Sequence, residues 1–107
     1  MASFAESLTT CRELGDRWLS GVCLEEVARL AFAREHYQRA AKLFGAAEEL
    51  HETLRYHQLP YDKADHDREV AFTRAALGDT AFASTRAGGR AMTLEQAIEY
   101  ALTVEPN

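Results

Sequence analysis

Histidine and aspartate side chains gather in the middle of the sequence and raise the question of a metal site. Asp62 and His66 are four residues apart and would share one face of a helix, whereas His51 and His57, six apart, would not. A stable zinc site needs three or four ligands. We therefore expect solvated polar residues and no metal here. A metal-dependent helical enzyme remains the least favoured alternative, and its ligands would be His51, His57, Asp62 and His66.

Carboxylate pairs are the other candidates for chemistry, and they are Glu25–Glu26, Glu48–Glu49 and Glu95–Glu99. A helical wheel places all of them on exposed faces, where carboxylates keep ordinary pKa values and do little acid–base catalysis. The sequence has no G-x-S-x-G serine, no phosphate-binding glycine loop and no dinucleotide fingerprint. We therefore predict no catalytic residue, no cofactor and no enzymatic activity.

Composition narrows the class of protein further. The chain of 107 residues has a net charge of -5, which argues against direct contact with nucleic acid. No stretch is long and apolar enough to span a membrane, and the first residues lack the layout of a signal peptide. The two cysteines, Cys11 and Cys23, are expected to be small buried hydrophobes in a reducing compartment. These features predict a cytoplasmic protein with no membrane contact.

The elements that would position these residues are all helices. Apolar residues recur at helical spacing, no segment alternates as a half-buried strand does, and glycines stand where helices should end. Thr93 and Gln96 form a capping box at the start of the last helix. Asp79 is expected to cap the start of the short helix that begins there. Gly15, Gly78 and the pair Gly88–Gly89 are expected as C-caps. The predicted helices are 4–14, 17–34, 37–56, 60–77, a short one beginning at Asp79, and one opening at Thr93.

The second and third of these helices carry a repeat-like spacing. Val27–Ala28 lies on the first helix of the pair, and Ala40, Phe44 and Ala47 lie on the second. This order of small and large residues resembles the tetratricopeptide (TPR) motif, a pair of antiparallel helices of about 34 residues. The sequence departs from the usual motif with Ala28 and Ala31 in its first helix and Glu52 at its end. The repeat would span about Gly21 to Leu54.

Other segments are similar to the C-terminal TPR arrays of large bacterial LuxR-type and SARP-type ATPase transcriptional regulators. These segments are Leu43-Phe44-Gly45-Ala46-Ala47-Glu48, Arg74-Ala75-Ala76-Leu77-Gly78, and Gly89 to Ala97. The resemblance implies an all-α, TPR-like superhelix in one domain, 1–107. It would comprise half a repeat at 1–15, a full repeat at 17–57 and C-terminal capping helices at 60–104. It also implies a protein-interaction or signal-sensing segment whose partner is a protein, a peptide or another domain of the parent regulator.

In the TPR family the first helix of each repeat lines a concave groove. The matching residues here are Val22, Glu25, Arg29, Phe32 and Ala33. Phe32 is either a peptide anchor in that groove or a core residue. Glu25 and Arg29 could equally form an ordinary surface pair.

The chain has fewer than the three repeats that an independent array usually needs. We therefore predict that the helix face of Phe4, Leu8 and Cys11 is covered by a second copy, which would give a homodimer. A free-standing dimeric helical protein with a purely structural role is the main alternative to an interaction segment.

Overall fold

The computed structural model describes residues 4–15, 17–54 and 63–103, and these residues form helices without strands. The all-α prediction is therefore confirmed, and most helix ends fall within a few residues of their predicted positions. Pro60, the expected start of the fourth helix, lies outside the described residues. The helices are α1 (Phe4–Leu14), α2 (Arg17–Ala33), α3 (Tyr37–Leu54), α4 (Lys63–Leu77), α5 (Asp79–Ala91) and α6 (Leu94–Leu102).

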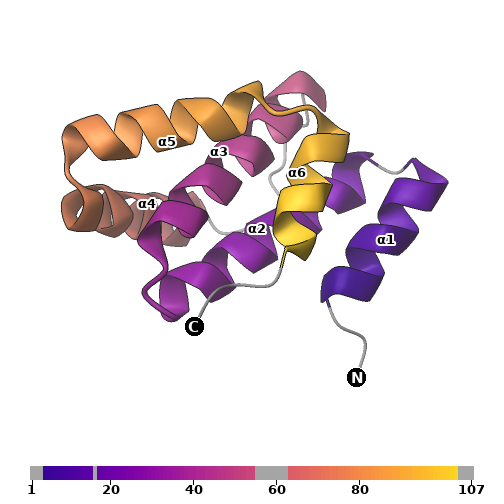
Figure 1. The fold of residues 1–107 in the computed structure, drawn as a ribbon, viewed down its shortest axis with the longest axis horizontal. Helices are drawn as coiled ribbons and strands as arrows, with labels where there is room; N and C mark the ends of the chain where they lie inside the picture. The colour runs from indigo at the N-terminus through magenta and orange to yellow at the C-terminus, as the bar shows by residue number, and fades with distance from the viewer. Residues whose placement is uncertain (1–3, 16, 55–62, 104–107) are drawn as a thin grey trace.

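The helices α2 and α3 form the centre of the molecule as an antiparallel pair (Figure 1). Their connection turns at Glu35, which adopts the left-handed φ of 63°. The amide of His36 donates to the carbonyl of Ala31 at 2.9 Å, and the amide of Glu35 donates to that of Phe32 at 3.0 Å. This is the bonding pattern of a Schellman ending, which stops α2 and returns the chain along α3.

The apolar core lies between α2, α3, α1 and α6. Small residues on α2 and α3 let the two helices approach closely, and larger side chains fill the spaces beside them. The buried cluster comprises Leu8 and Cys11 from α1, Cys23, Leu24, Val27, Ala28 and Ala31 from α2, Ala40, Leu43, Phe44, Ala46, Ala47 and Leu50 from α3, and Ala97 and Ile98 from α6.

Helix α5 packs along α3 with almost direct contact between the two backbones (Figure 1). A Cβ atom on Gly45 would overlap the carbonyl oxygen of Arg86, and one on Gly89 would overlap that of Lys42. The prediction that Gly88–Gly89 ends a helix is therefore wrong, because α5 continues through both residues to allow this crossing.

The starts of the last two helices differ in their caps. At α6, Thr93 Oγ1 accepts from the amide of Gln96 at 3.1 Å and Gln96 Oε1 accepts from the amide of Thr93 at 2.9 Å, which confirms the capping box. At α5, Gly78 holds the cap position with a φ of 89°, so the prediction that Asp79 is the cap is wrong. Asp79 instead accepts from Arg74 Nε at 2.8 Å.

The face of α1 expected to meet a second copy is covered within the chain. Leu8 is 0% exposed and Cys11 is 1% exposed. Helix α6 returns to pack against α1, and Arg12 on α1 pairs with Glu99 on α6 at 3.1 Å. The prediction of a self-association face is therefore wrong for Leu8 and Cys11, and the side chain of Phe4 lies outside the described part. Among the described helices, none is both long and apolar enough to cross a lipid bilayer.

Candidate functional site

Helix α4 lies over α2 and α3 with an unusually polar face. The only residues of α4 that are buried are His66 and Thr73, and Val70 is packed at the edge of the core. The sequence explains this, because the segment Lys63–Leu77 has no continuous apolar stripe. Charged side chains must therefore supply much of the contact that holds α4 in place.

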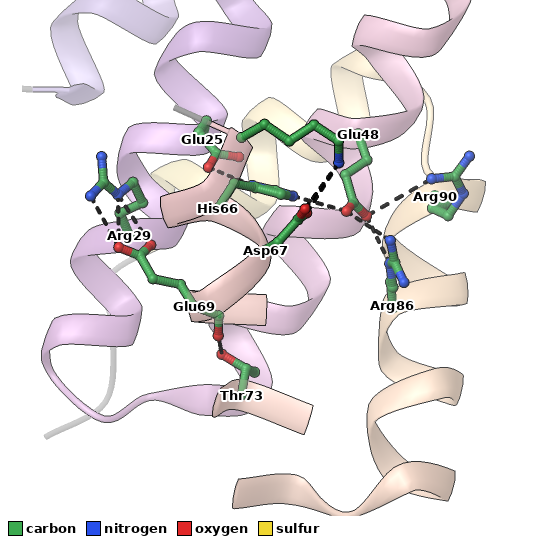
Figure 2. Close-up of polar contacts among 10 residues, drawn as sticks. Glu25, Arg29, Glu48, His66, Asp67, Glu69, Thr73, Arg86 and Arg90 are labelled. Atoms are coloured by element: carbon green, nitrogen blue, oxygen red, sulfur yellow. Dashed lines mark hydrogen bonds and ion pairs between the residues drawn. The ribbon is translucent and has the colours of Figure 1, made fainter. Parts of the chain in front are cut away.

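His66 lies between two carboxylates contributed by different helices. Its Nδ1 is 2.8 Å from Glu25 Oε2 on α2, and its Nε2 is 3.0 Å from Glu48 Oε2 on α3 (Figure 2). The ring also meets that of Phe44 edge-on, with centroids 5.3 Å apart. Ionised carboxylates only accept hydrogen bonds, so with both glutamates ionised both ring nitrogens carry protons to satisfy both contacts.

The charge on His66 is stabilised by its partners. Burial by itself would lower the pKa of His66, but the hydrogen bonds to Glu25 and Glu48 outweigh it and raise the pKa to about 9. The imidazole is thus a positively charged hydrogen-bond donor at neutral pH. It is poorly suited to act as a general base, since neither nitrogen has a free lone pair.

The two carboxylates differ in their surroundings. Glu48 also accepts from Arg86 Nε and Nη2, both at 2.7 Å, and these bonds and that to His66 outweigh burial and hold the pKa of Glu48 below its usual range. Within the described part of the chain no arginine hydrogen-bonds to Glu25 as Arg86 does to Glu48, and burial raises the pKa of Glu25. Among the described atoms, no hydrogen-bond partner reaches Glu25 Oε1. With both carboxylates ionised, the charges of Glu25, His66, Glu48 and Arg86 sum to zero.

A second charged contact joins α4 to α2 one turn further along. Arg29 Nε lies 3.1 Å from Glu69 Oε2 and Arg29 Nη2 lies 3.0 Å from Glu69 Oε1, which makes the pair bidentate (Figure 2). Thr73 Oγ1, one further turn on, donates to the Glu69 carbonyl at 2.8 Å. Glu25 and Arg29, considered as a possible surface pair, therefore each pair with α4 instead.

Three aromatic side chains pack together at the other end of the interface between α4 and α2. The ring of Phe32 meets that of Phe72 at 5.6 Å and that of Tyr37 at 6.0 Å, both edge-on. Phe32 is partly buried against the core, whereas Phe72 remains 56% exposed. Phe32 thus packs on the core and also contacts α4, and its role as a peptide anchor stays a prediction.

Three of the five residues expected to line a groove are therefore covered by α4: Glu25, Arg29 and Phe32. Val22 is half-buried and Ala33 is exposed, and neither belongs to these charged and aromatic contacts. The structure thus brings the central part of the expected groove together, but places a helix of the same chain in it.

Of the four residues of the enzyme alternative, His51 and His66 lie in the described part of the chain, and neither is grouped there with two further ligands. Glu25 and Glu48 contact opposite nitrogens of His66, so their carboxylates lie on opposite sides of the ring. His51 is buried beside Gly21, and burial lowers its pKa. Within 4–15, 17–54 and 63–103, no three His, Cys, Asp or Glu residues are grouped to hold a metal. His57 and Asp62 lie outside these ranges.

A cleft of about 480 Å³ beside α5 is lined in part by three arginines, but these already have carboxylate partners. Arg74 pairs with Asp79, Arg86 with Glu48, and Arg90 with Glu49 and Glu52. This cleft is a weaker candidate than the α4 interface, because an anion would have to displace existing ion pairs.

The prediction that Glu25 and Glu48 are exposed is wrong, while Glu95 and Glu99 are exposed as predicted. The sequence did contain a signal: Glu48 lies four residues after the core residue Phe44, and Glu25 lies three before Ala28. Both carboxylates therefore border the apolar stripes of their helices, at positions that another element can cover.

Comparison of the chain with protein-family models, with curated proteins and with solved structures gives no match.

Proposed function

We propose that this chain is a protein-interaction or signal-sensing segment of a larger regulator, of the TPR-like kind that the sequence resembles. Its binding face would be the side of α2 and α3 that carries Glu25, Glu48, Arg29 and Phe32. The observation that carries this proposal is the pair of buried carboxylates, Glu25 and Glu48, that meets a charged residue of a docked helix.

Stability alone is a poor reason for such a face. Removing charges from water costs free energy, and a buried ion pair often adds no more stability than an apolar contact of the same size. Buried charges can instead fix which partner binds and in which orientation. A face that combines two carboxylates, an arginine and an aromatic ring is therefore better suited to recognition than to simple packing.

The arrangement also favours recognition over catalysis. His66, the residue best placed for acid–base work, is held as a charged donor with both nitrogens engaged. Recognition of a protein or peptide, followed by relay to other domains of the regulator, needs no further chemistry from these residues.

A peptide-display selection tests the proposal. The bait would be the full chain, both as wild type and as Glu69→Gln, which neutralises the carboxylate partner of Arg29. We expect enriched peptides whose binding is lost in Glu25→Gln and Arg29→Gln chains, with folding followed by circular dichroism. Glu95→Gln, on the exposed face of α6, is the matched control and should leave binding unchanged. Lack of enrichment on both baits, or equal binding to all these variants, would contradict the proposal.

A further inference from the structure

We propose that the surface of α2 and α3 beneath α4 is a receptor for a helix of another protein, and that α4 occupies it as an internal substitute. The partner helix would place a cation at position i, a glutamate at i+3, a β-branched apolar residue at i+4 and a small residue at i+7. This inference rests on the proposed function and specifies its partner.

The first support is that α4 contributes little to the apolar core. The buried cluster is built by α1, α2, α3 and α6, and α4 adds only Val70 at its edge. Neighbouring α5, in contrast, is fixed to α3 by backbone contacts at Gly45 and Gly89. A helix that adds so little to the core can be exchanged with a smaller loss of apolar contact than one packed like α5.

The second support is the spacing of the contacts made by α4. Its inward residues are His66, Glu69, Val70 and Thr73, which are positions i, i+3, i+4 and i+7. This is the anchor pattern of an amphipathic helix bound in the groove of a partner protein. Most such ligands anchor through apolar residues, whereas here the first two anchors are charged.

The third support is charge complementarity at each of those two anchors. At the first, Glu25 and Glu48 on the receptor side face the cation His66, and Arg86 neutralises the excess negative charge. At the second, Arg29 faces the anion Glu69. A partner that lacked the cation would leave Glu25 buried without the counter-charge that it now contacts, which is costly, whereas Glu48 would keep Arg86. The receptor therefore selects a helix that carries a cation at position i and an anion at position i+3, in that order along the chain.

A partner helix must compete with α4 for the same surface, and α4 has the advantage that it is covalently connected to it. A segment tethered by a short linker has an effective local concentration in the millimolar range. An external helix must overcome this advantage, so a peptide should bind the wild-type chain weakly and bind tightly only when α4 is weakened.

A charge-swap experiment tests this. Two fluorescent peptides of the sequence 63–77 would be compared, one native and one with Glu69→Arg, against two full-length chains, Glu69→Arg and Arg29→Glu. Each substitution should repel α4 from its own chain. We expect the Glu69→Arg chain to prefer the native peptide, and the Arg29→Glu chain to prefer the substituted peptide, each by about tenfold or more in anisotropy titrations.

The control is the double variant Arg29→Glu/Glu69→Arg, which restores a reversed pair within the chain and should bind both peptides as weakly as wild type. If a charge reversal unfolds the chain, Glu69→Gln replaces it, because this chain keeps Arg29 and should still prefer the native peptide. Absent or equal binding of the two peptides to folded single variants would overturn the inference.

A wild-type mass that doubles, and returns to that of a monomer when native peptide is added, would also overturn it in favour of a second copy as the occupant. Selected display peptides that cross-link elsewhere would overturn the inference but leave the proposed function standing.

Discussion

The Nδ1 atom of His66 lies 2.8 Å from Oε2 of Glu25, although the two residues are 41 positions apart and both are almost fully buried. A proton on the His66 ring is therefore part of what holds α4 against α2. Glu48 contacts the other ring nitrogen. Loss of one ring proton would remove the positive charge of His66, and the contacts with Glu25 and Glu48 would both weaken.

The first prediction concerns the pH dependence of stability. The pKa of His66 is raised from 6.5 to about 9 in the folded chain, so its stabilising effect is complete below about pH 6.5 and is lost as the pH rises through about 9. The effect should be on the order of 3 kcal/mol at most. Urea denaturation between pH 6 and 10 should show the wild type losing more stability than His66→Gln. Parallel profiles for the two chains would contradict a charged His66.

A second prediction compares the two carboxylates. Glu48→Gln should destabilise the chain more than Glu25→Gln, because Glu48 holds both His66 and Arg86 whereas Glu25 holds His66 alone. We expect a loss of about 3 to 5 kcal/mol for Glu48→Gln and about 1 to 3 kcal/mol for Glu25→Gln. Both variants should lower the pKa of His66, which an NMR titration of its ring measures. The opposite order of stability, or an unchanged pKa, would show that the contacts are misassigned.

The third prediction uses neighbouring glycines on α5 as a matched pair. Gly89→Ala should destabilise the chain by about 1 to 3 kcal/mol or more, because its methyl group would meet the Lys42 carbonyl oxygen. Gly88→Ala has open space around it and should stabilise the helix by about 0.5 to 1 kcal/mol. Thermal melts of the two variants are a direct comparison. Similar shifts for both would mean that α5 does not cross α3 at Gly89.

The fourth prediction separates a core role for Leu8 from a role in self-association. Leu8 is 0% exposed within a single chain, so Leu8→Ala should cost about 2 to 5 kcal/mol of folding free energy. Light scattering across a concentration series should then give the same oligomeric state for the variant and the wild type. A Leu8→Ala chain that keeps its stability but changes its mass would restore the idea of an interface there.

Local features of the sequence were sufficient to place the helices. Gly15 and Gly78, both with positive φ, mark helix ends, and the Thr93–Gln96 box marks a helix start. These signals act within a few residues and need no knowledge of the tertiary fold. Gly89 was misjudged for the same reason, since a glycine required by a neighbouring helix looks like a helix end when only its own segment is considered.

The candidate site was much harder to predict. A helical wheel shows which face of α2 carries Glu25, but it cannot show that α4 will cover that face with His66. The two residues meet only because the chain folds back over distant elements, and the wheel therefore placed Glu25 in solvent. Phe32, Arg29 and Glu25 were singled out by the TPR resemblance as a group, but their actual partner was not predicted.

The glycine contact between α3 and α5 has a consequence for how the fold opens. It holds α5, the helix that follows α4, against α3, and α3 itself packs on α2, so α4 lies in sequence between two firmly packed helices. Its attachment depends on ion pairs and little apolar area. Its amide protons should therefore exchange with solvent through a local opening, at a lower free energy than those of α3 and without unfolding of the remaining helices.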